Sequence, residues 1–226
     1  GGDEVAIREF TLDRLLLIIR KVCDAIAFAH SRSVIHRDLK PENIMVGEFG
    51  EVLVMDWGLA KRLDEQNAPP NPILSTAIDP DDPTFQETLA GSVMGTPQYM
   101  APEQARGEIG EVDRLSDIYS LGAILYAILT LRAPVEGSTL DEILEKVASG
   151  AITSPTGVKS SAGEEKAKVE TVLEAKKIRP LPHVVAGKVP PALSAVAMKA
   201  LQLDKKDRYG EVASLAADVE AYQSGF

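Results

Sequence analysis

Three short motifs in a fixed order constrain this chain more than any other feature of its sequence. The first, His-Arg-Asp-Leu-Lys-Pro-Glu-Asn, occupies residues 36–43. Asp-Trp-Gly follows at residues 56–58, and Gly-Thr-Pro-Gln-Tyr-Met-Ala-Pro-Glu at residues 95–103. Carboxylate, ammonium and amide groups are concentrated in these motifs, as is typical of a catalytic or binding site.

The apolar pattern predicts a mainly α fold. Residues 11–30 repeat apolar side chains at helical spacing, with Thr11 as the capping residue. Residues 116–132, with Ser116 as the expected cap, are apolar on almost every side, which indicates a helix in the middle of a domain. Three more helices are expected at residues 139–149, 191–203 and 211–222, the last two joined by residues 204–208.

Short strands and irregular segments complete the pattern. The apolar runs at residues 44–46 and 52–55 flank a turn-prone Gly-Glu-Phe-Gly sequence and predict one β-hairpin. Residues 62–88 are rich in Pro, Asp, Glu and Thr without any period, which predicts a long mobile loop. Residues 150–180 are interpreted as an insertion. Residues 1–226 are therefore expected to form one domain, mainly α with a small β-hairpin element.

Composition and charge argue against several classes of function. The net charge of -10 disfavours binding to nucleic acids or to an anionic membrane surface, because both attract basic proteins. No run approaches the ~18 consecutive apolar residues of a membrane span, and residues 1–4 do not resemble a signal peptide. The single cysteine, Cys23, excludes an internal disulfide and is expected to pack in a helix. His30 and His183 have no motif around them and are interpreted as packing or surface residues. The expected location is cytoplasmic.

The three motifs, with Asp117 and Arg208 at matching places, resemble the large C-terminal lobe of serine/threonine protein kinases, the bacterial branch in particular. The resemblance extends from about Thr11 to Tyr222. It implies a protein-kinase-like fold and ATP-dependent phosphorylation of Ser or Thr hydroxyls on a protein substrate, with Mg²⁺ beside the nucleotide. Residues from about 56 to 103 would form the activation segment, which is longer than usual for the family.

Four side chains would perform the chemistry that the resemblance implies. Asp38 matches the catalytic base, which orients the attacking hydroxyl and accepts its proton. Lys40 would neutralise charge on the transferred phosphate, and Lys at this place matches the serine/threonine kinases. Asn43 and Asp56 match the two magnesium ligands, and oxygen ligands suit this hard cation. Met45 lies where the family places the floor of the adenine site.

The resemblance also implies that the activation segment can be ordered by phosphorylation. Arg37 directly precedes the base and would pair with a phosphate on that segment. Thr88 and Ser92 are the candidate phosphosites. If no phosphorylation occurs, Arg37 would instead meet a nearby carboxylate. Thr96 matches the residue whose hydroxyl bridges the base and its neighbouring lysine.

Five further residues match architectural positions of the family. Glu103 and Arg208 match a buried ion pair that anchors the substrate-docking segment to the lobe. Asp117 matches the carboxylate that holds the backbone of the catalytic loop. His36 and Trp57 match the apolar column that links the two lobes, with Trp where Phe is commoner. These residues support the fold more than they support the chemistry.

Several parts of a kinase have no match in this sequence. No Gly-x-Gly-x-x-Gly loop is found, and Val5-Ala6-Ile7-Arg8 imitates the strand of the phosphate-binding lysine only by coincidence. A missing N-terminal lobe is therefore an expected partner, beside the protein substrate. Two interpretations stay open: the catalytic lobe of a kinase, inactive alone, or a non-catalytic interaction module derived from one. An enzymatic parent is favoured by the complete set of Asp38, Lys40, Asn43 and Asp56.

Overall fold

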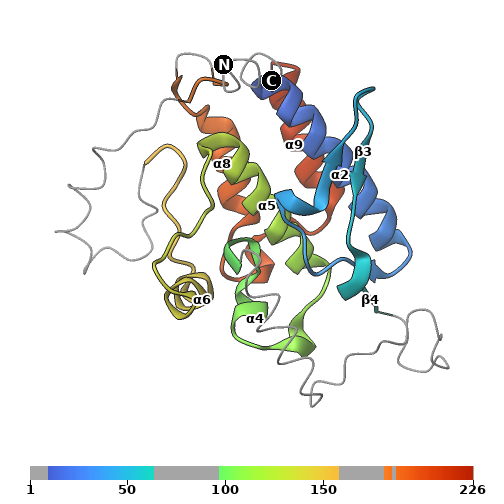
Figure 1. The fold of residues 1–226 in the computed structure, drawn as a ribbon, viewed down its shortest axis with the longest axis vertical. Helices are drawn as coiled ribbons and strands as arrows, with labels where there is room; N and C mark the ends of the chain where they lie inside the picture. Colours follow the sequence, from blue (N-terminus) through green and yellow to red (C-terminus); the bar gives the residue numbers. More distant parts are fainter. Residues whose placement is uncertain (1–9, 64–96, 158–180, 185–186, 226) are drawn as a thin grey trace.

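The computed structural model of this chain describes residues 10–63, 97–157, 181–184 and 187–225. Four helices make the body of the fold. They are α2 (Leu12–Ser31), α5 (Arg114–Thr130), α8 (Pro191–Ala200) and α9 (Val212–Gln223). Figure 1 shows α2 lying along α9 and α5 lying along α8, and α2 also packs on α5. Shorter helices, α4 (Pro102–Ala105) and α6 (Leu140–Ser149), lie beside this body and contact each other.

Helix α2 forms where the sequence predicts it. The Thr11 side chain accepts a hydrogen bond from the backbone of Arg14 and caps the helix. One side of the helix is apolar and buried, formed by Leu12, Leu16, Ile19, Val22, Cys23 and Ile26. The exposed side carries charged residues and also two apolar ones, Leu17 and Phe28. Cys23 is buried there as expected, and burial raises the pKa of its thiol to about 12.

Helix α5 is the central helix, and its observed start corrects one prediction. The helix begins at Arg114, and its cap is Asp113, whose side chain accepts from the backbone of Leu115. Ser116 is instead the third helical residue and returns a hydrogen bond by accepting from the Asp113 N–H. The predicted burial on every side is confirmed, because Ile118 to Tyr126 are all buried.

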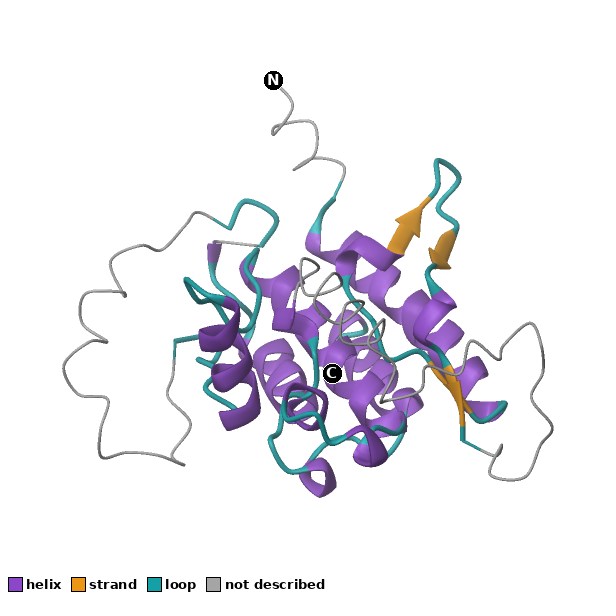
Figure 2. Cartoon of the chain, turned by 60° about the horizontal axis from the view of Figure 1, so that its bottom comes forward, coloured by secondary structure: helices purple, strands orange, loops and turns teal. Residues whose placement is uncertain are grey.

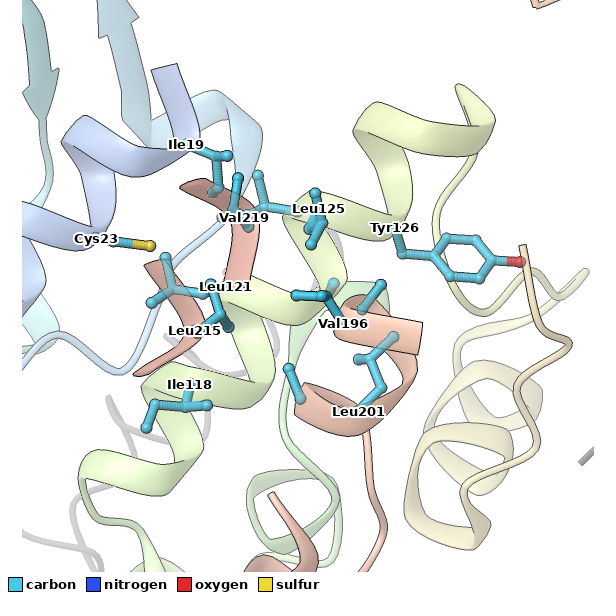
Figure 3. Close-up of a cluster of buried hydrophobic side chains, with 14 of the residues drawn as sticks. Ile19, Cys23, Ile118, Leu121, Leu125, Tyr126, Val196, Leu201, Leu215 and Val219 are labelled. Carbon is cyan, nitrogen blue, oxygen red and sulfur yellow. The ribbon is translucent and has the colours of Figure 1, made fainter. Parts of the chain in front are cut away.

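The core lies between these four helices. Figure 3 shows apolar side chains of α2, α5, α8 and α9 converging in one cluster. Helices α5 and α8 approach each other closely, because a Cβ placed on Gly122 would lie only 2.5 Å from the Ala200 Cβ. A small residue at position 122 is therefore required for this contact.

Two pairs of short strands lie on one side of the helical body (Figure 2). The predicted hairpin is confirmed as β2 (Ile44–Val46) and β3 (Val52–Val54), with Met45 opposite Leu53. A second antiparallel pair, β1 (Val34–Ile35) with β4 (Lys61–Arg62), was not predicted. Two-residue strands are too short to show a period in the sequence.

Other expectations receive mixed outcomes. Helix α8 ends at Ala200, three residues earlier than expected, and α9 matches its predicted span to one residue at each end. The predicted loop at 62–88 and the inserted segment at 150–180 lie largely outside the described residues. Among the described residues, no helix has both the length and the apolar character that a membrane crossing needs.

Candidate active site

The loop between β1 and β2 presents the first motif, and Asp117 of α5 holds its backbone. The buried Asp117 carboxylate accepts the N–H of His36 at 2.9 Å and the N–H of Arg37 at 2.9 Å. Arg37 has a positive φ of 73°, a conformation that costs a non-glycine residue of order 1–3 kcal/mol. Because both N–H groups are bonded to one carboxylate, the turn is maintained despite this cost.

Asp38 is held by two polar neighbours from the same loop. The Lys40 Nζ lies 2.8 Å from Asp38 Oδ2. The amide nitrogen of Asn43 donates to the Asp38 backbone oxygen at 2.7 Å and to Oδ2 at 3.1 Å. Among the described residues these contacts all use Oδ2 or the backbone, which leaves Oδ1 for a further donor. About a quarter of the Asp38 side chain is exposed, so a substrate can reach it.

The second motif is joined to the first through the backbone. The Met55 N–H donates to the Asn43 carbonyl at 2.8 Å, and this brings Asp56 next to the catalytic loop. Asp56 is exposed and adopts the left-handed conformation, with Oδ1 accepting from Gly58 at 3.4 Å. Asx side chains tolerate this conformation because they bond locally to the backbone.

Asn43 and Asp56 suit a magnesium ion in the kind of atom they offer. Among the described residues, both side-chain hydrogen bonds of Asn43 are donated by Nδ2, so its side-chain oxygen is the atom that can face a cation. Asp56 contributes an exposed carboxylate. Magnesium favours such oxygen ligands, and one or two protein ligands are enough when phosphate and water complete the shell.

His36 connects the two motifs in a further way. Its Nε2 donates to the Met55 carbonyl at 3.0 Å, and its Nδ1 accepts from the Asp38 N–H at 3.3 Å. One nitrogen donates and the other accepts, which defines a neutral tautomer. The His36 ring is buried and lies 4.6 Å, centroid to centroid, from the ring of Trp57.

A surface hollow opens beside Asp38. Arg37, Lys40, Tyr99 and Met100 are among the residues that line it, with Asp38 at its wall. Tyr99 belongs to the third motif. Its backbone is bonded to α5, because the Ser120 hydroxyl donates to the Tyr99 carbonyl at 2.8 Å. The first and third motifs therefore meet at this hollow.

The end of the third motif is anchored by an ion pair inside the protein. Arg208 donates to both carboxylate oxygens of Glu103 at 2.9 Å, and Ser116 donates to Glu103 Oε1 at 2.7 Å. Burial by itself would raise the pKa of Glu103, but the hydrogen bonds from Arg208 and Ser116 outweigh it and hold that pKa below its usual value.

The Nε atom of Arg37 is buried and has no hydrogen-bond partner among the described residues. Burial lowers the pKa of Arg37, and the charge of Asp117 opposes this shift. The candidate phosphosites Thr88 and Ser92 lie outside the described residues, as does Thr96.

Met45 lies on an exposed apolar face of the hairpin. Its side chain is half exposed and faces the same way as its cross-strand partner Leu53, which is also about half exposed. Met55 continues this apolar face. Met55 directly precedes Asp56 in the chain. An adenine floor would likewise have to lie beside the metal ligand.

Sequence reasoning missed the place of two histidines. His30 is buried, and its Nε2 donates to Asp117 Oδ2 at 2.8 Å, so the Asp117 carboxylate accepts three N–H groups in all. His183 is also buried and donates to the Ile128 carbonyl at 2.6 Å. No motif surrounds His30, so only the folded arrangement reveals its link to the catalytic loop.

Comparison with known proteins agrees with this geometry. The family model described as the protein kinase domain matches residues 4–219. A curated relative, the serine/threonine-protein kinase PknD of Protochlamydia amoebophila, is 38% identical over 213 residues, which is 93% of this chain and 18% of the relative. PknD of Chlamydia felis is 36% identical over 213 residues. The chain spans about a fifth of the length of these relatives.

Solved structures show the same fold at lower sequence identity. The twitchin kinase region from C. elegans superposes with a TM-score of 0.59 at 21% identity, covering 92% of this chain and 28% of that one. The autoinhibited serine kinase domain of the giant muscle protein titin gives a TM-score of 0.58 at 17% identity, covering 95% of this chain and 51% of that one. The protein-kinase-like fold predicted from the motifs is confirmed, and the chain belongs to the protein kinase family.

Proposed function

We propose that this chain is the catalytic lobe of a serine/threonine kinase, which transfers the γ-phosphoryl group of ATP to Ser or Thr hydroxyls of a protein. The observation that carries the proposal is the arrangement around Asp38. Lys40 and Asn43 both contact its Oδ2, and Asp56 follows a residue that is hydrogen-bonded to Asn43. A base, a phosphate-neutralising cation and two oxygen ligands are the groups that phosphoryl transfer requires.

The chemistry assigned to Asp38 follows from its Oδ1 atom, which has no partner among the described residues. The substrate hydroxyl donates to Oδ1, and Asp38 orients that hydroxyl and accepts its proton as the new P–O bond forms. The bond between the γ-phosphorus and the β–γ bridging oxygen breaks, and ADP leaves. Lys40 counters negative charge on the transferred group. Asn43 and Asp56 would hold magnesium, which would supply positive charge at the phosphate oxygens.

The preference for Ser and Thr over Tyr rests on two residues. Lys40 at this place matches serine/threonine kinases, and Thr96 would bridge it to Asp38 through its hydroxyl. The contact of Lys40 with Asp38 supports the first half of this argument. The curated relatives that carry the name serine/threonine kinase support the same choice.

Arg37 is assigned to the control of the activation segment, residues from about 56 to 103. A guanidinium whose buried Nε has no partner among the described residues is suited to receiving an anion, and a phosphate on Thr88 or Ser92 is the proposed one. The alternative is that no phosphorylation occurs and that Arg37 instead meets a nearby carboxylate.

A second, N-terminal lobe is the proposed structural partner. The sequence has no Gly-rich loop and no phosphate-binding lysine strand, so a lid over the phosphates must come from elsewhere. The exposed apolar face of Met45, Leu53 and Met55 supports this, because removing such a face from water by contact with another lobe is favourable. Alone, the chain is proposed to be inactive. Because the reaction consumes ATP, the proposed location is cytoplasmic.

A kinase assay of the full-length protein tests the proposal. Incubation with labelled ATP, Mg²⁺ and a generic protein substrate should give phosphoserine or phosphothreonine, and Asp38→Asn should abolish most of it. Dominant phosphotyrosine would refute the assigned specificity. If the full-length protein transfers no phosphate but the chain still captures a protein partner, the interaction-module alternative replaces the catalytic one.

A further inference from the structure

Gln104 joins the third motif to the catalytic loop. It lies in α4, one residue after Glu103, and its side-chain Nε2 donates to the Arg37 carbonyl at 2.8 Å. Its Oε1 accepts from the Ala101 N–H at 3.2 Å. One amide side chain therefore connects the start of α4 to the residue before Asp38, 67 positions earlier in the chain.

The two partners of Gln104 determine which way its amide points. A backbone N–H can only donate, so the Ala101 N–H selects the oxygen of the amide. A carbonyl can only accept, so the Arg37 oxygen selects the nitrogen. Both ends of the amide are satisfied in this orientation and neither would be satisfied in the other.

The bond from Gln104 acts on the peptide group that leads into Asp38. This group consists of the Arg37 carbonyl and the Asp38 N–H, and each half has a partner: Gln104 for the carbonyl and His36 Nδ1 for the N–H. The preceding N–H, that of Arg37, is bonded to Asp117. Since a peptide group is planar, holding both of its ends fixes the plane from which the Asp38 Cα extends.

We propose that Gln104 is a positioning residue for Asp38, acting through the Arg37–Asp38 peptide group. The backbone at Arg37 has a φ of 73°, which an L residue leaves readily unless its peptide groups are held. Gln104 holds this turn through the Arg37 carbonyl, and Asp117 holds it through the Arg37 N–H. The inference rests on the proposed function, in which Asp38 is the base. It makes correct placement of α4 a condition for correct orientation of that base.

Three variants separate this bond from the other roles of Gln104. Gln104→Glu keeps an acceptor for the Ala101 N–H but replaces the donor to Arg37 with an oxygen that repels the carbonyl. Gln104→Met has a similar length and loses both bonds. The matched control is Gln223→Glu at the end of α9, because Gln223 also accepts through Oε1, from Arg20, and donates through Nε2 to a carbonyl, that of Asp13.

The first measurement is amide hydrogen exchange at single residues in this chain. We expect Gln104→Glu and Gln104→Met to accelerate exchange of the Arg37 and Asp38 N–H groups by about 10-fold, as the loss of one ordinary hydrogen bond allows. Gln223→Glu should leave both rates unchanged. Equal rates in all variants would show that Gln104 does not hold the peptide and would overturn the proposal.

The second measurement is steady-state phosphorylation by the full-length protein. A misdirected base lowers kcat, by about 10-fold to 100-fold, and leaves the KM for ATP unchanged, because Gln104 does not contact the nucleotide site. A parental kcat in both Gln104 variants would overturn the proposal. If the unmutated protein has no activity, the proposed function fails, and the exchange rates still decide whether Gln104 positions the peptide.

Discussion

Arg208 donates parallel hydrogen bonds to the two carboxylate oxygens of Glu103, a residue 105 positions earlier in the chain. Both side chains are almost completely buried. Arg208 also donates to the carbonyls of Gln202, Leu115 and Leu203, so each part of its guanidinium has a partner. The pair fixes α4, at the end of the third motif, to the loop that joins α8 and α9.

Breaking this pair should cost stability and change its dependence on pH. Glu103→Gln leaves the Arg208 charge buried and unpaired, so the free energy of unfolding should fall by about 3–5 kcal/mol at pH 7. The pKa of Glu103 is lowered in the fold, so its stabilising contribution exists above its ordinary pKa and is lost as the pH falls through the lowered value. Urea unfolding from pH 7 to pH 3 measures both effects. A variant with the acid sensitivity of the parent would contradict this account.

Gly122→Ala should destabilise the contact between α5 and α8. The added Cβ would lie 2.5 Å from Ala200 Cβ and 3.4 Å from the Ala197 carbonyl oxygen, and neither atom belongs to a flexible side chain. Overpacking costs about 1–3 kcal/mol, against a gain of about 1 kcal/mol in helix propensity. Thermal unfolding is the measurement. Gly110→Ala is the control, since nothing lies within 4 Å of its added Cβ.

His30→Phe should weaken the support of the catalytic loop. The change removes one of three N–H donors from the buried Asp117 carboxylate, and an imperfectly satisfied buried charge costs about 1–3 kcal/mol of stability. His30→Gln can still donate and should retain more of that stability. Urea unfolding of the two variants provides the comparison. If His30→Phe is as stable as His30→Gln, the hydrogen bond to Asp117 makes no net contribution to the free energy of unfolding.

Long apolar periods and the motifs themselves could be interpreted correctly from the sequence. Helix α2 and the hairpin β2–β3 appear where their patterns predict them, because local periodicity and a strong turn determine both. The predicted start of α5 was wrong by two residues, since Ser116 and Asp113 are both good caps and the sequence does not say which of them caps the helix.

Contacts between distant segments could not be predicted in the same way. The link from His30 to Asp117 spans 87 residues, and the link from Gln104 to Arg37 spans 67. Neither His30 nor Gln104 belongs to a sequence pattern that predicts its contact. The pairing of β1 with β4 also depends on where the rest of the chain brings two dipeptides. Such contacts follow from tertiary packing, which a single sequence does not display.

This chain by itself should bind ATP and Mg²⁺ only weakly. The sequence contains no Gly-rich loop and no phosphate-binding lysine strand, and nucleotide sites normally bury most of their ligand. Calorimetric titration should show no saturable binding below about 1 mM nucleotide. A micromolar dissociation constant would show that the described lobe holds the nucleotide without a partner lobe. Asp56→Asn distinguishes metal-dependent binding from nonspecific association if any heat is detected.

Asp38→Asn and Asp56→Asn in the full-length protein should separate the base from the metal ligand. Asn at position 38 has nearly the same shape but cannot accept a proton from the substrate, so turnover should fall by about 10²–10⁴-fold. ATP affinity should hardly change, because Asp38 faces the hollow lined by Tyr99 and Met100.

Asn at position 56 keeps an oxygen but loses the negative charge that attracts magnesium, so its effect should appear mainly as weaker binding of ATP·Mg²⁺. Because Asp56 is exposed, its replacement should not destabilise the fold as a whole. Thermal unfolding of both variants checks this. Turnover number and nucleotide affinity, measured together, give the contrast. Near-parental turnover of Asp38→Asn would mean that phosphoryl transfer does not occur at this loop, and the interaction-module alternative would then account better for the chain.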